Sequence, residues 1–188
     1  MSSHPRKGPS HLPGDPRPNR QLERAIRVNH AGEYGAKRIY AGQIAVLGNE
    51  ECGDTLRHMA EQEQVHLDAF SKELNERRIR PSALSPLWHV MGYALGAGTA
   101  MISEKAAMAC TVAVEEVIDE HYAQQRDWLA GEGKEPELVE MIERFRQEEV
   151  EHRDIGYENG AEDAPAYPLL TGAIKKGSKL AIWLAERV

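Results

Sequence analysis

Residues 63–66 read Glu-Gln-Val-His, and residues 149–152 read Glu-Val-Glu-His. Both segments are Glu-x-x-His, and residues three apart share one face of a helix, so each pair can bind one ion from one side. The motif is weak evidence alone: with 23 glutamates and eight histidines in the chain, about one match is expected by chance. The residues around each motif therefore decide whether it is a metal site.

Each motif falls within an apolar helical stripe. Helices are predicted over residues 51–77 and 136–156, and both stripes recur with helical period. The stripe residues are Leu56, Met59, Ala60, Leu67, Phe70 and Leu74 in the first helix, and Leu138, Met141, Ile142 and Phe145 in the second. A carboxylate that faces a core without a partner costs several kcal/mol or more. A solvated acidic face is therefore excluded, whereas pairing of each glutamate with a buried Arg or Lys remains an alternative.

Two further predicted helices each bring one inward carboxylate. The helix over residues 20–48 places Glu33 on its apolar stripe, and the helix over residues 104–130 places Glu115 on its own. Glu116 shares a face with acidic residues and is expected to point toward water. Glu115 is therefore the better ligand candidate of these two neighbours.

Together these residues define a metal site between four helices. The separations of 30 residues from Glu33 to Glu63 and 34 from Glu115 to Glu149 suit two antiparallel hairpins. One Glu from each of two helices and Glu-x-x-His from each of the other two is the ligand set of di-iron and di-manganese carboxylate bundles. Four carboxylates balance two divalent ions, and oxygen ligands with one imidazole per ion suit iron or manganese rather than thiolate-bound zinc. The predicted fold is all-α: a ferritin-like four-helix bundle with two additional hydrophobic or amphipathic helices.

The two additional helices carry the features of a membrane-facing surface. Residues 81–103 contain no Asp, Glu, Lys or Arg, but glycines dilute their hydrophobicity, so a buried or membrane-touching helix is predicted rather than a span. The last helix, over residues 169–188, has an apolar face with Lys175, Lys176 and Lys179 mainly on its other side. It is interpreted as lying in a membrane surface, with the lysines meeting anionic lipid. A bundle helix with a solvated lysine face is the alternative.

The N-terminal segment and the net charge bear on the domain boundary, on export and on possible partners. Residues 1–20 are rich in proline and weakly basic, with almost no large apolar residue, which predicts a disordered tail before a single domain over 21–188. They lack the apolar core of a signal peptide. A net charge of −7 argues against nucleic acid as a partner.

The histidines outside the motifs are ambiguous. His121 lies beside Tyr122 near the predicted metal layer, where hydrogen bonding or proton transfer and plain packing are both open interpretations. His30, one turn before Glu33, can likewise be interpreted as a neighbour of the metals or as a surface residue. His58 shares its face with Gln62 and is expected to be solvated.

Four longer runs resemble the demethoxyubiquinone hydroxylases, the di-iron monooxygenases of ubiquinone biosynthesis. The runs are residues 27–36 (RVNHAGEYGA), 92–100 (GYALGAGTA), 109–116 (ACTVAVEE, followed by His121-Tyr122) and 145–156 (FRQEEVEHRDIG). The resemblance extends from about Leu22 to Val188. Asn29 stands where an Asp is expected and Ala106 where a Gly is expected, but neither is a ligand position.

The resemblance implies an activity, a cofactor and a location. Members hydroxylate a ring carbon of a polyprenylated demethoxybenzoquinol with O2, the penultimate step toward ubiquinone. By matching positions, two iron ions per chain would be bound by Glu33, Glu63, His66, Glu115, Glu149 and His152. His121 and Tyr122 would lie near the quinone and the path of protons or electrons. Members are peripheral membrane proteins and some act with a lipid-binding partner protein; this chain resembles a bacterial member on the cytoplasmic side of the cell membrane.

Two other classes of protein fit parts of the pattern. A ferritin-like iron-oxidising protein would use the same six ligands, but it has no need of the uncharged segment 81–103. A membrane-surface scaffold without catalytic activity would explain that segment and the last helix, but not four inward carboxylates.

Overall fold

The computed structural model describes residues 19–188, and within that range it contains helices and turns but no β-strand. The helices are α1 (Arg20–Leu47), α2 (Gly53–Glu76), α3 (Ser85–Ile102), α4 (Glu104–Glu132), α5 (Pro136–Glu158), the short 3-10 helix η1 (Ala161–Asp163) and α6 (Tyr167–Ala185). The predicted all-α class is confirmed, and helix ends differ from the predicted ones by a few residues at most. The predicted disordered tail falls almost wholly outside the described residues; Asn19 caps α1, accepting from the backbone N–H of Gln21 and Leu22.

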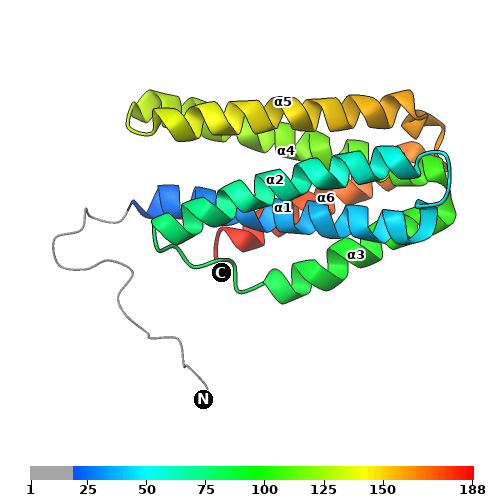
Figure 1. Ribbon diagram of the computed structural model, residues 1–188, viewed down its shortest axis with the longest axis horizontal. Coiled ribbons are helices and arrows are strands. Elements are labelled where there is room, and N and C mark those ends of the chain that lie inside the picture. The colour runs from blue at the N-terminus through cyan, green and yellow to red at the C-terminus, as the bar shows by residue number, and fades with distance from the viewer. Residues whose placement is uncertain (1–18) are drawn as a thin grey trace, which may run out of the picture.

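Two helical hairpins, α1–α2 and α4–α5, form the bundle (Figure 1). The second hairpin turns where Gly133 adopts a left-handed conformation, with φ of 64°, and Pro136 begins α5 with a backbone already suited to a helix. One apolar cluster, including Leu56, Met59 and Val112, fills one end of the bundle. Another, including Phe70 and Phe145, fills the other end. The predicted ligands lie between these two clusters.

Helix α3 packs against α1 at very short range. A Cβ atom on Gly96 would lie 1.9 Å from the carbonyl oxygen of Ile39, and one on Gly42 would lie 2.3 Å from that of Tyr93. Only residues without a side chain permit this approach. Because α3 buries little besides Gly92, Gly96, Thr99 and Ala100, most of its larger apolar side chains remain on the surface.

Helix α6 lies beside α4 and also contacts α1. Lys179 forms an ion pair of 2.8 Å with Glu120, and Lys175 pairs with Glu116. Two of the three lysines expected to meet anionic lipid therefore contact α4 instead. Sequence reasoning missed this because the partners lie on another helix.

The surface formed by α3 and α6 is apolar. Of the twelve large hydrophobic side chains exposed in the described chain, nine belong to these two helices. They are Leu87, Val90, Met91, Tyr93, Met101 and Ile102 of α3, and Leu169, Leu180 and Trp183 of α6. Both helices pack against the same apolar clusters on α1 and α4: Leu95 and Leu170 contact one cluster, and Trp88 and Ile182 contact another. Among the helices within residues 19–188, none has both the length and the apolar character needed to cross a bilayer.

Candidate metal centre

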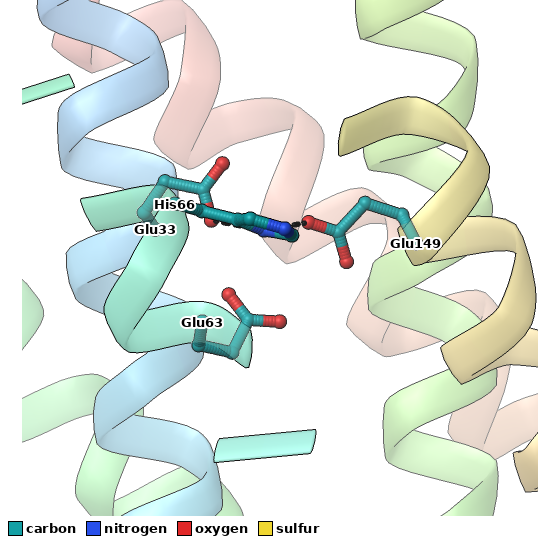
Figure 2. Close-up of side chains that lie close together, drawn as sticks. All are labelled: Glu33, Glu63, His66 and Glu149. Carbon is teal, nitrogen blue, oxygen red and sulfur yellow. Dashed lines mark hydrogen bonds and ion pairs between the residues drawn. The ribbon is translucent and has the colours of Figure 1, made fainter. Parts of the chain in front are cut away.

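The six predicted ligands converge in the middle of the bundle, each at most 1% exposed. They form two groups whose ligand atoms lie within 4.8 Å of one another. The first group is Glu33, Glu63, His66 and Glu149, and the second is Glu63, Glu115, Glu149 and His152. Glu63 and Glu149 belong to both. Figure 2 shows the first group, with side chains from α1, α2 and α5 directed toward one another.

Both histidines present the same ring nitrogen to the carboxylates. His66 Nδ1 lies 3.0 Å from Glu149 Oε1 and 3.6 Å from Glu33 Oε2 (Figure 2). His152 Nδ1 lies 3.2 Å from Glu149 Oε2 and 3.3 Å from Glu63 Oε1. Glu149 therefore contacts both imidazoles, one through each oxygen, and each Nε2 points away from the centre.

The donor set fits a pair of metal ions. Both oxygens of Glu63, Oε2 of Glu33 and Oε2 of Glu115 are buried without a hydrogen-bond partner. Buried oxygens of this kind are costly unless something binds them. The partners that these carboxylates do have are histidines and tyrosines, not the Arg or Lys that the alternative interpretation required. These buried Glu and His side chains can bind metal.

Burial and mutual contact shift the pKa values of the buried carboxylates and histidines. Burial, reinforced by the charge of Glu149, raises the pKa of both Glu63 and Glu115 well above the usual value. Burial alone would lower the pKa of His66, but its hydrogen bond with Glu149 and the nearby carboxylate of Glu33 outweigh that effect and raise the pKa to about 12. Burial would raise the pKa of Glu149, but hydrogen bonds from His152 and His66 lower it to about 2. Metal bound by these side chains would therefore compete with protons for them.

Each unshared glutamate accepts a hydrogen bond from a tyrosine. Sequence reasoning predicted Tyr122 near the metal layer, but it did not predict the contact of Tyr122 with Glu33 or any role for Tyr40. Tyr40 Oη, on α1, donates to Glu115 on α4 at 3.1 Å. Tyr122 Oη, on α4, donates to Glu33 on α1. In both helices the tyrosine follows the glutamate by seven residues, two helical turns along the same face. That spacing was available in the sequence as a signal.

The site has an approximate two-fold symmetry between its hairpins. Adding 82 to a residue number in α1 gives the equivalent in α4, and adding 86 in α2 gives the equivalent in α5. The equivalent residues are Glu33 and Glu115, Tyr40 and Tyr122, Glu63 and Glu149, and His66 and His152. Each hairpin thus supplies one half-site.

The other candidates are placed less centrally. His121 is half-buried, with its Nε2 2.7 Å from the Gln125 amide nitrogen, and burial lowers its pKa. It lines a cavity of about 360 Å³ between α1, α4 and the end of α6. His30 is also half-buried, with a buried Nδ1 that has no partner. Glu116 does not point freely into water, because it accepts from Tyr157 at 2.9 Å and pairs with Lys175.

The chain buries four glutamates and two histidines in two overlapping groups within a helical bundle, which is the arrangement of the ferritin-like carboxylate bundles. Within that class, residues 20–185 match the model of the family described as "Ubiquinone biosynthesis protein COQ7", and the chain belongs to that family.

Its relatives include bacterial and mitochondrial proteins. It is 60% identical to "3-demethoxyubiquinol 3-hydroxylase" of Rhodospirillum rubrum over 178 residues, which cover 94% of this chain and 83% of the relative. It is 52% identical to the human "NADPH-dependent 3-demethoxyubiquinone 3-hydroxylase, mitochondrial" over 169 residues, 89% of this chain and 78% of the relative. It is 41% identical to "5-demethoxyubiquinone hydroxylase, mitochondrial" of Saccharomyces cerevisiae over 182 residues, 89% of this chain and 78% of the relative.

Proposed function

We propose that this chain hydroxylates a ring carbon of a polyprenylated demethoxybenzoquinol with O2, using two iron ions per chain. The observation that carries the proposal is the pair of overlapping buried groups that share Glu63 and Glu149. The names of the relatives supply the substrate class.

In this proposal Glu63 and Glu149 would contribute to both metal positions. Glu33 and His66 would hold one ion with them, and Glu115 and His152 would hold the other. Oxygen ligands with one imidazole per ion suit iron, and six side chains around two ions leave coordination positions open. Bound iron would supply the activation of O2. The protein's own contribution is to hold the ligands and to exclude water, since every ligand is almost fully buried.

We assign proton transfer to His121 and Tyr122. Tyr122 donates a hydrogen bond to Glu33, and the neighbouring His121 lines the cavity between α1, α4 and α6. Tyr122 contacts a candidate ligand and His121 reaches the cavity, so the two side chains together can move a proton toward the surface. We expect His121→Ala and Tyr122→Phe to keep most of the iron and to lose turnover, because neither side chain is a ligand.

We propose that the α3–α6 surface binds a membrane, on the cytoplasmic side of the cell membrane. A substrate with a polyprenyl tail lies in lipid, and nine exposed large hydrophobic side chains on two helices that pack on the same apolar clusters support lipid contact. A lipid-binding partner protein, implied by the family resemblance, would use the same surface to deliver the substrate.

The activity can be tested with iron-loaded protein, a short-tailed demethoxybenzoquinol, a chemical reductant and ¹⁸O2. Mass spectrometry should find one oxygen-18 atom in the hydroxylated product. His66→Ala should abolish product, whereas His58→Ala on the exposed face of the same helix should not. Oxidation of Fe(II) without hydroxylated product would reject the proposal and support the iron-oxidising alternative.

A further inference from the structure

The outward nitrogens of the two ligand histidines contact different kinds of acceptor. His66 Nε2 donates to Glu148 Oε2 at 2.5 Å, and His152 Nε2 donates to Gln62 Oε1 at 3.0 Å. Each acceptor immediately precedes the shared glutamate of the opposite Glu-x-x-His motif. The contacts therefore cross between α2 and α5 in both directions.

Gln62 and Glu148 are symmetry equivalents, separated by the same 86 residues that relate α2 to α5. The four other equivalent pairs at the site are chemically identical, Glu with Glu, Tyr with Tyr and His with His. This fifth pair differs, with a neutral amide on one side and a carboxyl group on the other. The two half-sites are thus alike in their ligands and unlike in what supports the histidines.

A hydrogen bond from the outer nitrogen fixes which ring nitrogen carries the proton and leaves the inner Nδ1 lone pair for a metal. A carboxylate acceptor does more than an amide, because it draws the proton more strongly and makes the imidazole a better electron donor. The shorter contact is the one to the carboxylate. Glu148 has a side chain only 28% exposed, against a fully buried His66, so solvent screens this bond little.

We infer that Glu148 and Gln62 are positioning residues that make the two metal positions unequal, with the Glu33–His66 position binding its ion more tightly than the Glu115–His152 position. The inference rests on the proposed metal function. The difference between Glu148 and Gln62 would explain why two nearly symmetric half-sites bind their ions one after the other rather than together.

The test is titration of the metal-free full chain with Co(II), whose visible absorption reports the coordination of each ion without turnover. We expect two resolved binding steps for the wild-type protein. Glu148→Gln, which keeps the size and an acceptor oxygen, should weaken the tighter step by about tenfold or more and bring the steps together. Gln62→Glu should instead strengthen the weaker step.

Glu151→Gln is the matched control, since it removes the same charge from an exposed position on the same helix. Equal effects of Glu148→Gln and Glu151→Gln would reduce the result to general electrostatics and overturn the inference, as would two coincident steps in the wild-type protein. Absence of Co(II) binding by the wild-type protein would overturn the proposed metal function together with it.

Discussion

The membrane proposal can be tested on the two most exposed large hydrophobic residues of α6. Leu169 is 76% exposed and Leu180 is 57% exposed, so replacing both by Asp should leave the fold intact. Full burial of a leucine side chain is worth roughly 1.5–3 kcal/mol. Scaled by these exposed fractions, lipid contact by the pair contributes about 2–4 kcal/mol, before the cost of placing two carboxylates against lipid.

That free energy corresponds to a loss of about thirtyfold or more in the partition coefficient. Flotation of the protein with phosphatidylcholine vesicles, with and without phosphatidylglycerol, measures it directly. The double variant should stay at the bottom of the gradient and lose activity on a long-tailed quinol. It should largely keep activity on a short-tailed, soluble quinol, because the candidate ligands are untouched.

Val65→Asp provides the control, because Val65 is 59% exposed on α2, a helix outside the α3–α6 surface. This variant should float like the wild-type protein. Equal loss of flotation in Val65→Asp and in the double variant would refute the assignment of the surface. A wild-type protein that never floats would refute membrane binding altogether. Only a modest gain from phosphatidylglycerol is expected, since Lys175 and Lys179 are already paired with α4.

Three further outcomes are expected. Glu115→Ala should lower bound iron, measured by mass spectrometry of the metal, from about two ions per chain toward one, whereas Glu116→Ala should leave it unchanged; equal losses would contradict the helix-face assignment. The pKa of His66 is raised from 6.5 to about 12 in the metal-free chain, so protonated His66 stabilises the fold fully below pH 6.5 and this stabilisation is lost as the pH rises. The melting temperature of the metal-free chain should therefore fall between pH 7 and 9. Parallel curves of melting temperature against pH with and without metal would contradict this. Gly96→Ala should cost about 1–3 kcal/mol, or roughly 2–12 °C in melting temperature, because its Cβ would collide with α1, while Gly98→Ala meets nothing within 4 Å and should not destabilise the chain.

Much of the fold was accessible from sequence because the helices obey simple periodicity. The stripe through Leu56 and Phe70 fixed the inward face of α2, and Glu63 and His66 lie on it as expected. The discrimination between Glu115 and Glu116 likewise agrees with their positions, since only Glu115 reaches the buried cluster. The apolar stripe of a helix shows which of its faces points inward, without knowledge of the other helices.

Contacts between helices could not be inferred in the same way. Gln62 was expected to face water beside His58, yet it accepts a hydrogen bond from His152 on α5. Lys175 looked like a lipid contact, yet it pairs with Glu116. In each case the contact depends on the distance and rotation between two helices. The side-chain volumes across the interface determine that geometry, and the apolar stripe of one helix does not.

The symmetric polar layers between α1 and α4 explain how four carboxylates can be confined without metal. Beyond the Glu33–Tyr122 and Tyr40–Glu115 layers lie two more hydrogen-bonded layers. Asn29 and Gln125 exchange two hydrogen bonds of 2.8 Å at one end, and Gln43 donates to the Ala107 carbonyl at 3.0 Å at the other.

Each of these outer pairs is buried and joins the two hairpins directly, so the hairpins do not depend on the ligands to stay together. A buried hydrogen-bonded amide fixes the rotation of both helices, because any slip would strand polar groups in the core. The raised pKa values of His66, Glu63 and Glu115 favour protonation, which would reduce the repulsion that remains. We therefore expect metal to enter a folded bundle and to exchange for protons, rather than to drive the folding of the chain as it does in small zinc domains.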